Sequence, residues 1–350
     1  MDRSAEFRSD TFTLPDAGMR RAIYAAEVGN AAYGEDPSVT ELELTVAEYF
    51  GREAALFFPS ATMAGQSAIA VWCKPAEVVL IEQYGHNFYF ETGSMAFISG
   101  TQAQPLPAEN GILAPATLAA AIRHVENPHA RTGLIVLENT SNYGGGTVYP
   151  LATLKHIFNL AGTHELPVHI DGARLFNALQ HYRLSDPAVR PGALLTATGS
   201  VSLCFSKGLG APMGAALVGD ADFIAEAARV RTLLGGTLRQ AGFMAAAALY
   251  ALRHNVERLV EDHRNARALA AGLAGIDGLA VALDTVQTNM VYVEVEEGAG
   301  RAARLIEQLG ESGVRAWNLG RRLRFVTSML VDNTDCDYAV AAVAKAMSAA

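Results

Sequence analysis

Six short apolar runs in the first two thirds of the chain constrain its fold most strongly. They are EAALFFPS (53–60), EVVLIEQYG (77–85), TGLIVLENT (132–140), LPVHIDGA (166–173), SVSLCFS (200–206) and GAALVGD (214–220). Between many of them lie segments of helical periodicity, such as residues 151–165, whose apolar side chains share one face. Apolar strands that alternate with amphipathic helices predict an α/β fold with a mostly parallel central sheet and helices on both faces. Ligands of such sheets bind at the carboxyl ends of the strands.

The last third of the chain has a different pattern. From residue 240 to about residue 275 it is rich in Ala and Leu and contains no proline, which predicts one long helix leading out of the sheet domain. Strand-like runs at 278–295 and 322–330 flank a helical segment at 302–313, which together predict a small α+β domain. We therefore divide the chain into an N-terminal segment (1–25), a large α/β domain (26–250) and a small C-terminal α+β domain (251–350).

Composition excludes several classes of function. A formal charge of −9 argues against nucleic acid as a partner, because binding to phosphate backbones needs clustered Lys and Arg. No run approaches the ~18 apolar residues of a membrane helix, so no membrane partner is expected. The N-terminus lacks an apolar signal region, so we expect a cytoplasmic protein that acts on a small molecule. The three cysteines lack zinc-site spacing, and His169 with Asp171 has no spaced third ligand, so no metal is expected.

Two charged residues stand at the ends of neighbouring predicted strands. Asp171 ends the run PVHID and Lys207 follows SVSLCFS, about one β-α-β unit of ~30 residues later, so their side chains should meet at one edge of the sheet. Pyridoxal phosphate needs such a pair, because a lysine binds it as an imine and an acid keeps its ring nitrogen protonated. A strand-end ion pair explains the same two residues.

The segment FFPSATMAG (57–65) offers a site for the phosphate of that cofactor. Ser60 with Thr62 can cap a helix that begins near Ala61, and the free amides of a helix N-terminus suit an anion. A plain N-cap is the alternative. The glycines of 208–214 do not match a dinucleotide fingerprint, and we expect Gly208 and Gly210 to leave room for a bulky cofactor. The run YGGGTVYP (143–150) predicts a tight turn.

Several segments resemble one family. They are RSDTFT (8–13), AEVGNAAYGEDPSVTELE (26–43), EAALFFPSATMAGQ (53–66), LENTSNYGGGTVYPL (137–151), HIDGARLFNA (169–178), SKGLGAPMGAALVG (206–219), LLGGTLRQAG (233–242) and LVEDHRNARALA (259–270). In this order they are similar to the low-specificity L-threonine aldolases of the β-eliminating lyase group, which are fold-type I pyridoxal phosphate enzymes. The resemblance runs from about Phe7 to about Thr327. It implies reversible cleavage of an L-3-hydroxy amino acid to glycine and an aldehyde by a homodimer or homotetramer.

The resemblance also implies roles for individual residues. Catalysis would involve Lys207, His86, Asp171 and Ser141. The cofactor would contact residues from several segments, namely Ser60, Ala61, Thr62, His86, Asp171, Arg174, Lys207 and Arg239. The substrate would contact Ser9, Tyr33, Arg174 and Arg324, with the arginines holding its carboxylate. Phe90 and Tyr33 are candidates for the wall of the aldehyde pocket. The loop 31–43 would reach into a neighbouring subunit, and a surface turn that caps the following helix is the alternative.

The chain departs from the family pattern at three positions. Ala61 replaces a glycine of the phosphate loop, and Ser141 and Ser328 stand where the family often has histidine. A serine hydroxyl cannot act as a base at neutral pH, so we expect a water between His86 and Ser141 to take the β-hydroxyl proton. The smaller serine should also admit a bulkier aldehyde. Racemisation, β-elimination or aldol transfer on the same cofactor is the alternative activity, and a non-catalytic cofactor-binding scaffold is the third possibility.

Overall fold

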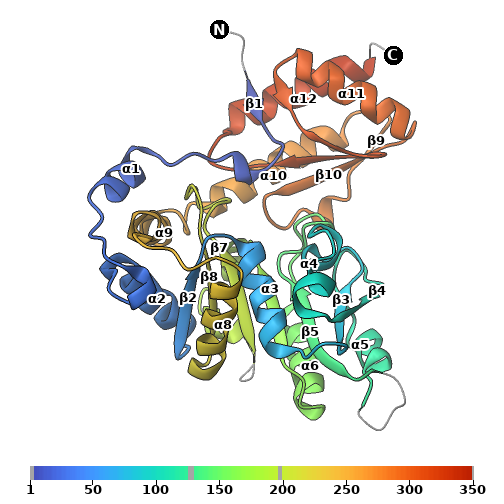
Figure 1. The fold of residues 1–350 in the computed structure, drawn as a ribbon. Coiled ribbons are helices and arrows are strands. Elements are labelled where there is room, and N and C mark those ends of the chain that lie inside the picture. The colour runs from blue at the N-terminus through green and yellow to red at the C-terminus, as the bar shows by residue number, and fades with distance from the viewer. Residues whose placement is uncertain (1–3, 125–129, 196–198, 349–350) are drawn as a thin grey trace.

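A seven-stranded sheet forms the centre of the large domain in the structure, a computed structural model that describes residues 4–124, 130–195 and 199–348 (Figure 1). Its order is β2-β8-β7-β6-β5-β3-β4. The strands are β2 (Ala54–Phe58), β3 (Val78–Glu82), β4 (Gln102–Leu106), β5 (Thr132–Glu138), β6 (Val168–Gly172), β7 (Ser200–Cys204) and β8 (Ala215–Gly219). Strands β4, β3, β5, β6 and β7 are parallel, and β8 is antiparallel to its two neighbours, β2 and β7. The predicted α/β class with a mostly parallel sheet is confirmed.

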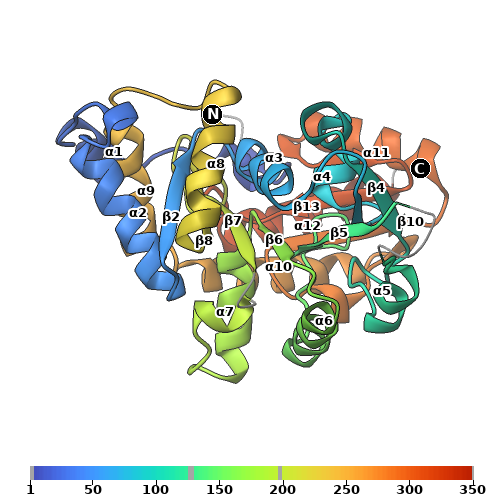
Figure 2. The same ribbon diagram turned by 60° about the horizontal axis from the view of Figure 1, so that its bottom comes forward.

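Helices cover both faces of this sheet, as Figure 2 shows. They are α2 (Pro37–Phe50), α3 (Ala61–Trp72), α5 (Pro115–Ala121), α6 (Leu151–Thr163), α7 (Leu175–Ser185), α8 (Ala221–Leu233) and α9 (Gly242–His254). Alternate residues of one strand serve the two faces: Leu134 of β5 packs in the cluster that contains Ile69 of α3, whereas Ile135 packs in the cluster that contains Ile157 of α6. Burial on both faces explains why the predicted strands read as continuous apolar runs.

The prediction of one long helix over 240–275 is wrong. Helix α9 ends at His254, and the chain leaves the helix at Asn255. A separate helix, α10 (Leu259–Ala274), begins at Leu259. Asn255 is buried, and its side-chain amide donates a 2.8 Å hydrogen bond to the carbonyl of Leu209. Asparagine disfavours a helix interior because its side chain competes for backbone groups. The segment between the two helices is therefore hydrogen-bonded, through Asn255, to the loop that follows Lys207.

The small domain is built on a four-stranded antiparallel sheet of order β12-β13-β10-β9. Its strands are β9 (Leu279–Ala280), β10 (Met290–Val295), β12 (Trp317–Leu319) and β13 (Arg322–Val326), and its helices are α10, α11 (Ala299–Glu311) and α12 (Asn333–Ser348). The N-terminal strand β1 (Ala5–Glu6) lies with the small domain (Figure 1), where it pairs with β11 (Val314–Arg315). Phe7 packs edge-on against Phe325. The predicted α+β class is confirmed, and the boundaries at residues 25 and 250 stay predictions.

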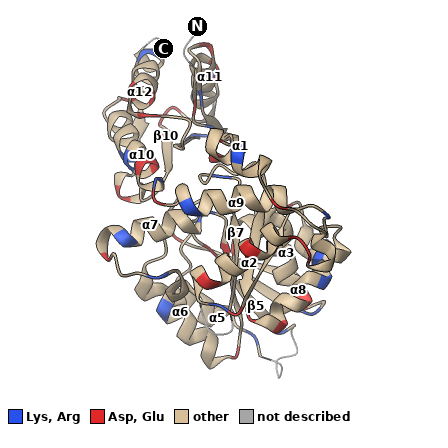
Figure 3. Ribbon diagram, turned by 90° about the vertical axis from the view of Figure 1, so that its left-hand side faces the viewer, with Lys and Arg blue, Asp and Glu red and all other residues tan. Residues whose placement is uncertain are grey.

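The surface carries charges of both signs. In the view of Figure 3, basic and acidic residues lie interspersed over both domains. None of the helices in the described ranges combines the length and apolarity needed to span a bilayer. The same part of the chain contains no group of three or more His, Cys, Asp or Glu side chains that could hold a metal ion. All three cysteines are free and buried.

Candidate active site

Two adjoining cavities lie at the carboxyl ends of the central strands. The lysine cavity, of about 190 Å³, is lined by Ala61, Thr62, His86, Glu91, Asp171, Ala173, Cys204 and Lys207. The arginine cavity, of about 240 Å³, is lined by Ser9, Thr11, His86, Phe90, Asn142, Arg174, Lys207, Tyr292, Trp317, Leu319 and Arg324. Because His86 and Lys207 line both, the two cavities share a wall.

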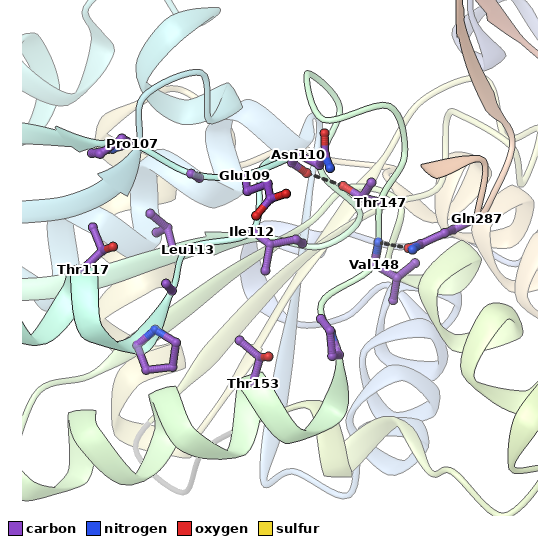
Figure 4. Close-up of a pocket in the computed structure, with 14 residues that line it drawn as sticks. Pro107, Glu109, Asn110, Ile112, Leu113, Thr117, Thr147, Val148, Thr153 and Gln287 are labelled. Atoms are coloured by element: carbon purple, nitrogen blue, oxygen red, sulfur yellow. Dashed lines mark hydrogen bonds between the residues drawn. The ribbon is translucent and has the colours of Figure 1, made fainter. Parts of the chain in front are cut away.

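A much larger hollow, of about 870 Å³, lies elsewhere on the large domain. Figure 4 shows that its walls come from the chain around Pro107 to Thr117, the turn at Thr147 and Val148, and Gln287 of the small domain. It contains none of the residues to which the sequence assigns chemistry. Volume alone therefore does not locate the active site, and the two smaller cavities are the candidates.

The unit β6-α7-β7 brings Asp171 and Lys207 together. Strands β6 and β7 are parallel neighbours, with Asp171 opposite Ser202, and Lys207 follows the end of β7. The carbonyl of Lys207 accepts hydrogen bonds from Thr13 Oγ1 at 2.8 Å and from the Gly210 amide at 2.9 Å. Asp171 is buried and accepts from the Ala173 amide at 3.1 Å. The two side chains line one cavity, as expected from the topology, and their chemical roles stay predictions.

The expected reason for the glycines after Lys207 is wrong. A Cβ atom at Gly208 would face Cδ2 of Leu259 at 3.0 Å, and one at Gly210 would lie 2.7 Å from Cε of Met329. Gly210 also has a φ of 79°, which glycine adopts without strain. These glycines therefore allow close packing against the small domain and the helix leading to it, and they do not make room for a cofactor.

Helix α3 begins at the lysine cavity. Ser60 is its N-cap, and the Ser60 hydroxyl accepts a 3.2 Å hydrogen bond from the Met63 amide, so the predicted cap is confirmed. Ala61 and Thr62 occupy the first turn, where backbone amides have no acceptor within the helix. They line the cavity that contains Lys207. Arg239, which the resemblance places at the cofactor phosphate with Ala61 and Thr62, is exposed and lines neither cavity.

Two arginines lie in the arginine cavity, each held by other groups. Arg174 is buried and donates from Nε and Nη2 to the two carboxylate oxygens of Asp10, at 2.8 and 2.6 Å. Burial raises the pKa of Asp10, but the charge and hydrogen bonds of Arg174, together with the charge of Lys207, lower the pKa below its ordinary value. Arg324 on β13 donates to Asn142 Oδ1 at 3.2 Å and to the Arg8 carbonyl at 2.9 Å.

His86 begins the short helix α4 (His86–Tyr89), which follows β3 after the turn of residues 83–85. Its Nδ1 lies 2.9 Å from Glu91 Oε1, and its backbone amide donates to Glu138 Oε2 at 3.1 Å. Burial lowers the pKa of His86, but the hydrogen bond to Glu91 and the charges of Asp171 and Glu138 raise it, and the net shift is upward. Burial, followed by the charge of Asp171, raises the pKa of Glu138 to about 7.

Besides Ser60 and Arg239, three residues named from the sequence lie outside both cavities, namely Ser141, Ser328 and Tyr33. Ser141 is buried, its hydroxyl accepts from the Gly144 amide at 3.1 Å, and it faces Gly111, where a Cβ atom would collide with it. Ser328 is fully buried, and Tyr33 is 79% exposed. The structure does not bring Ser141 beside His86 at the cavity wall, so the expected water between them has no support here and the catalytic role of Ser141 stays a prediction. Ser9 and Phe90 do line the arginine cavity.

Sequence reasoning missed several residues at the site, namely Asp10, Glu91, Glu138, Asn142, Tyr292 and Trp317. Asp10 stands next to Ser9 in a quoted motif, and a carboxylate beside a predicted cavity arginine is a signal for an ion pair. Glu91 follows Asn87, the neighbour of His86, by four residues, a helical spacing that favours contact. Nothing in the sequence marks Trp317, because its place depends on the pairing of β12 with β13.

An amine, a carboxylate and an imidazole meet beside a helix N-terminus at the carboxyl edge of a parallel sheet. Together with the small C-terminal domain, they define an α/β enzyme of fold type I. Residues 6–296 match the beta-eliminating lyase family, and the chain belongs to this family.

Known relatives support this assignment. A probable low-specificity L-threonine aldolase of Arabidopsis thaliana is 38% identical over 98% of this chain and 97% of its own length. The low-specificity L-threonine aldolase of Escherichia coli K12 is 39% identical over 93% of each chain. The solved threonine aldolase of Leishmania major has a TM-score of 0.82 at 20% identity, over 97% of this chain and 99% of that one, so it shares the fold.

Proposed function

We propose that this chain is a pyridoxal phosphate-dependent aldolase of L-3-hydroxy amino acids. It cleaves substrates of the threonine and allo-threonine type reversibly to glycine and an aldehyde. The names of the relatives from Arabidopsis and E. coli support this activity at 38% and 39% identity. The single observation that carries the proposal is the lysine cavity, where Lys207, Asp171 and His86 lie beside the first turn of α3.

The residues of the lysine cavity fit the cofactor. Lys207 supplies the amine that binds its aldehyde, and Asp171 supplies a buried carboxylate for its ring nitrogen. The amides of Ala61 and Thr62 suit its phosphate, because Ser60 already satisfies the Met63 amide and fixes the turn. When bound, pyridoxal phosphate supplies an electron sink for the electron pair left at Cα.

The arginine cavity holds the substrate carboxylate. Asp10 takes the N–H of Nε and one N–H of Nη2 of Arg174, which leaves Nη1 and the second N–H of Nη2 for a ligand. The Nε of Arg324 is buried without a partner in the described structure. Asp10 holds Arg174, and Asn142 and the Arg8 carbonyl hold Arg324, so the free N–H groups of the two arginines have fixed positions. The Ser9 hydroxyl lines the same cavity, where it donates to Asp10 Oδ1 at 3.4 Å. A carboxylate held in this way sets which bond at Cα is aligned for cleavage.

His86 takes the proton of the substrate's β-hydroxyl group at Nε2. Loss of that proton lets the β oxygen become the carbonyl of the released aldehyde as the Cα–Cβ bond breaks. The electron pair of that bond stays with Cα, which then gains a proton to complete glycine. A histidine in this role contributes about 100-fold or more to the rate.

The test is an assay of glycine and acetaldehyde formed from L-threonine and L-allo-threonine, with Lys207→Ala as the control. The wild type should form both products in equal amounts, and the variant should form neither. A racemised amino acid, or ammonia with a keto acid, in place of glycine would establish one of the alternative reactions. Borohydride reduction should label Lys207, and a label on Lys155 or Lys345 would contradict its assignment.

We further propose that the active protein is a homodimer or a dimer of dimers in the cytoplasm. Arg239 and Tyr33 are exposed, and the Arg239 carbonyl accepts a 2.9 Å hydrogen bond from the Ala31 amide, so the two residues share one surface. From there Arg239 would serve the phosphate of a partner's cofactor. Mixing inactive Lys207→Ala with inactive Arg239→Ala should restore activity, and a fully active monomer in light scattering would refute the assembly. Three free cysteines fit a reducing compartment, which cell fractionation tests.

A further inference from the structure

We propose that Glu91 is the positioning residue of His86. Its carboxylate accepts a hydrogen bond from the Nδ1–H group of His86. This bond fixes the neutral ring in the Nδ1–H tautomer and leaves the lone pair of Nε2 for the substrate. This inference rests on the proposed function, because it concerns the base that receives the β-hydroxyl proton. Glu91 lines the lysine cavity, but its two carboxylate oxygens are hydrogen-bonded to His86, Gln66 and Asn87, so we assign it a role through His86.

The hydrogen bonds of Glu91 assign the donor and the acceptor. Its side chain is 3% exposed, and Oε1 accepts from Asn87 Nδ2 at 3.2 Å while Oε2 accepts from Gln66 Nε2 at 2.6 Å. Amide nitrogens only donate, so both oxygens of Glu91 act as acceptors. An ionised carboxylate only accepts, so with Glu91 ionised the proton of the 2.9 Å hydrogen bond between Oε1 and His86 Nδ1 lies on Nδ1. Gln66 and Asn87 are themselves buried, which fixes this arrangement.

The other ring nitrogen is the one available for chemistry. His86 lines both cavities together with Lys207, and with Nδ1 bound to Glu91 only Nε2 remains. Phe90 stacks on the imidazole with ring centroids 5.5 Å apart, which restricts the ring further. Among the described residues, no second histidine lines either cavity, and Ser141 is turned toward Gly111. The tautomer of His86 therefore decides whether the site has a base.

Several charges face His86 from the surrounding elements. Glu138 lies at the end of β5, Asp171 in β6, Lys207 after β7 and Glu91 after α4. The three carboxylates raise the pKa of His86, whereas burial and Lys207 lower it. Removing the charge of Glu91 should therefore lower the pKa of His86 and release its tautomer. A purely structural Glu91, one that only ties Gln66 to Asn87, would not produce these two effects.

Nitrogen NMR of the holoenzyme labelled with ¹⁵N-histidine tests the proposal directly. The signal of His86 is identified by its loss in His86→Gln. In the wild type the neutral His86 ring should carry its proton on Nδ1. In Glu91→Gln the titration midpoint of His86 should move to lower pH, and its neutral ring should be a mixture of the two tautomers. The acid limb of kcat/KM for threonine should move in the same direction. We expect kcat to fall about tenfold or more with KM little changed, and Glu91→Asp to restore part of it.

A matched control is Glu77→Gln. Glu77 is another buried glutamate, which binds Arg131 and the Lys74 amide at the opposite end of β3, so its loss should leave the His86 signal unchanged. A neutral wild-type ring with its proton on Nε2 would overturn the proposal even if Glu91→Gln fails to fold. A Glu91→Gln enzyme that loses stability and activity without a shift of the His86 midpoint would also overturn it. If the wild type forms no glycine but holds the Nδ1 proton, only the proposed function fails.

A separate observation, the register of the small-domain sheet, bears on the substrate. Trp317 of β12 pairs with Arg324 of β13, and Arg324 pairs with Tyr292 of β10. Residues directly opposite one another share a face of the sheet, so the indole lies beside the guanidinium that faces the substrate carboxylate. Leu319, two residues beyond Trp317, lies on the same face. Phe90 of the large domain lines the same cavity.

From this register we infer that Trp317, Leu319 and Phe90 bind the substituent on Cβ of the substrate, and that they favour an aryl or branched alkyl group over methyl. Trp317 is 47% exposed and Phe90 is 40% exposed, and both line a cavity that also contains Arg174, Lys207 and Arg324. Exposed aromatic side chains gathered beside charged groups are typical of a binding site. This inference also rests on the proposed function, and it names the class of side chain that the aldolase prefers.

The test compares kcat/KM for phenylserine and threonine. Trp317→Ala should lower the ratio about tenfold or more, and Trp317→Phe should lower it less. The chain has two tryptophans, so in Trp72→Phe the fluorescence reports on Trp317 alone. Uncleavable L-phenylalanine should quench this signal at lower concentration than L-alanine does, whether or not threonine is cleaved. A substrate ratio that Trp317→Ala leaves unchanged would overturn the inference.

Discussion

The ion pair between Asp10 and Arg174 should be the most costly polar contact to break by one substitution. Asp10 is fully buried, Arg174 is 7% exposed, and two hydrogen bonds of 2.8 and 2.6 Å join them. Asp10→Asn keeps the size of the side chain but leaves a guanidinium without its counter-charge. Arg174 cannot lose its proton, so the free energy of unfolding should fall by about 3–5 kcal/mol. With a urea m value on the order of 3 kcal/mol/M, the unfolding midpoint should fall by about 1–1.7 M.

The matched control removes both charges. In Asp10→Leu/Arg174→Met neither charge of the pair is left buried without its partner, so the double variant should be more stable than Asp10→Asn. The pH dependence gives a second check. Because the pKa of Asp10 is lowered in the folded state, the pair stabilises the wild type above the unfolded pKa of about 4 and loses this contribution as pH falls below it. The difference in the free energy of unfolding between wild type and Asp10→Asn should therefore be constant above about pH 5 and decrease in acid. A midpoint shift below about 0.3 M, or a double variant as unstable as Asp10→Asn, would refute this reasoning.

Four further substitutions test the surroundings of the site. Asn255→Ala removes a buried donor to a backbone carbonyl and should cost about 1–3 kcal/mol in urea unfolding. Gly210→Ala should cost about 1–3 kcal/mol because of its positive φ, and adding Met329→Ala should recover only the part due to the side-chain contact. The raised pKa of Glu138, about 7, makes the unfolding free energy fall as pH rises from about 4 to 7, and Glu138→Gln should flatten this slope. Ser141→His should lower the thermal midpoint without raising threonine turnover, because the serine side chain already fills its space. Higher turnover at unchanged stability would contradict that result.

The fold was largely readable because its strongest signals are local. All six apolar runs form strands. A strand buried on both faces is a continuous run of apolar residues, so it can be recognised from the sequence without knowing which strand it pairs with. Strand β4 was not predicted because it forms the edge of the sheet, where polar residues and proline are tolerated, and it contains Gln102, Gln104 and Pro105. The break at Asn255 was not predicted for a different reason. Its cause is a contact with Leu209, distant in sequence, which no periodicity reveals.

The site was readable only where topology or a motif determined it. Asp171 and Lys207 follow from the rule that parallel strands end at one edge of a sheet. The direction of Ser141 could not be read, because it depends on how the loop at Gly111 packs against the turn after β5. Trp317 depends on a register set by neighbouring strands. The part of the site missing from the sequence analysis is thus the part made by contacts between distant segments.

The N-terminal segment links these distant parts into one unit. Strand β1 pairs with β11 and Phe7 packs on Phe325, so this segment is anchored in the small domain. A few residues later Asp10 binds Arg174, and Thr13 binds the carbonyl of Lys207, both in the large domain. The Arg8 carbonyl between them accepts from Arg324, so one short stretch of chain contacts both arginines of the site and the lysine. Any displacement of the small domain must therefore move these contacts together, which couples the geometry of the carboxylate site to that of the amine.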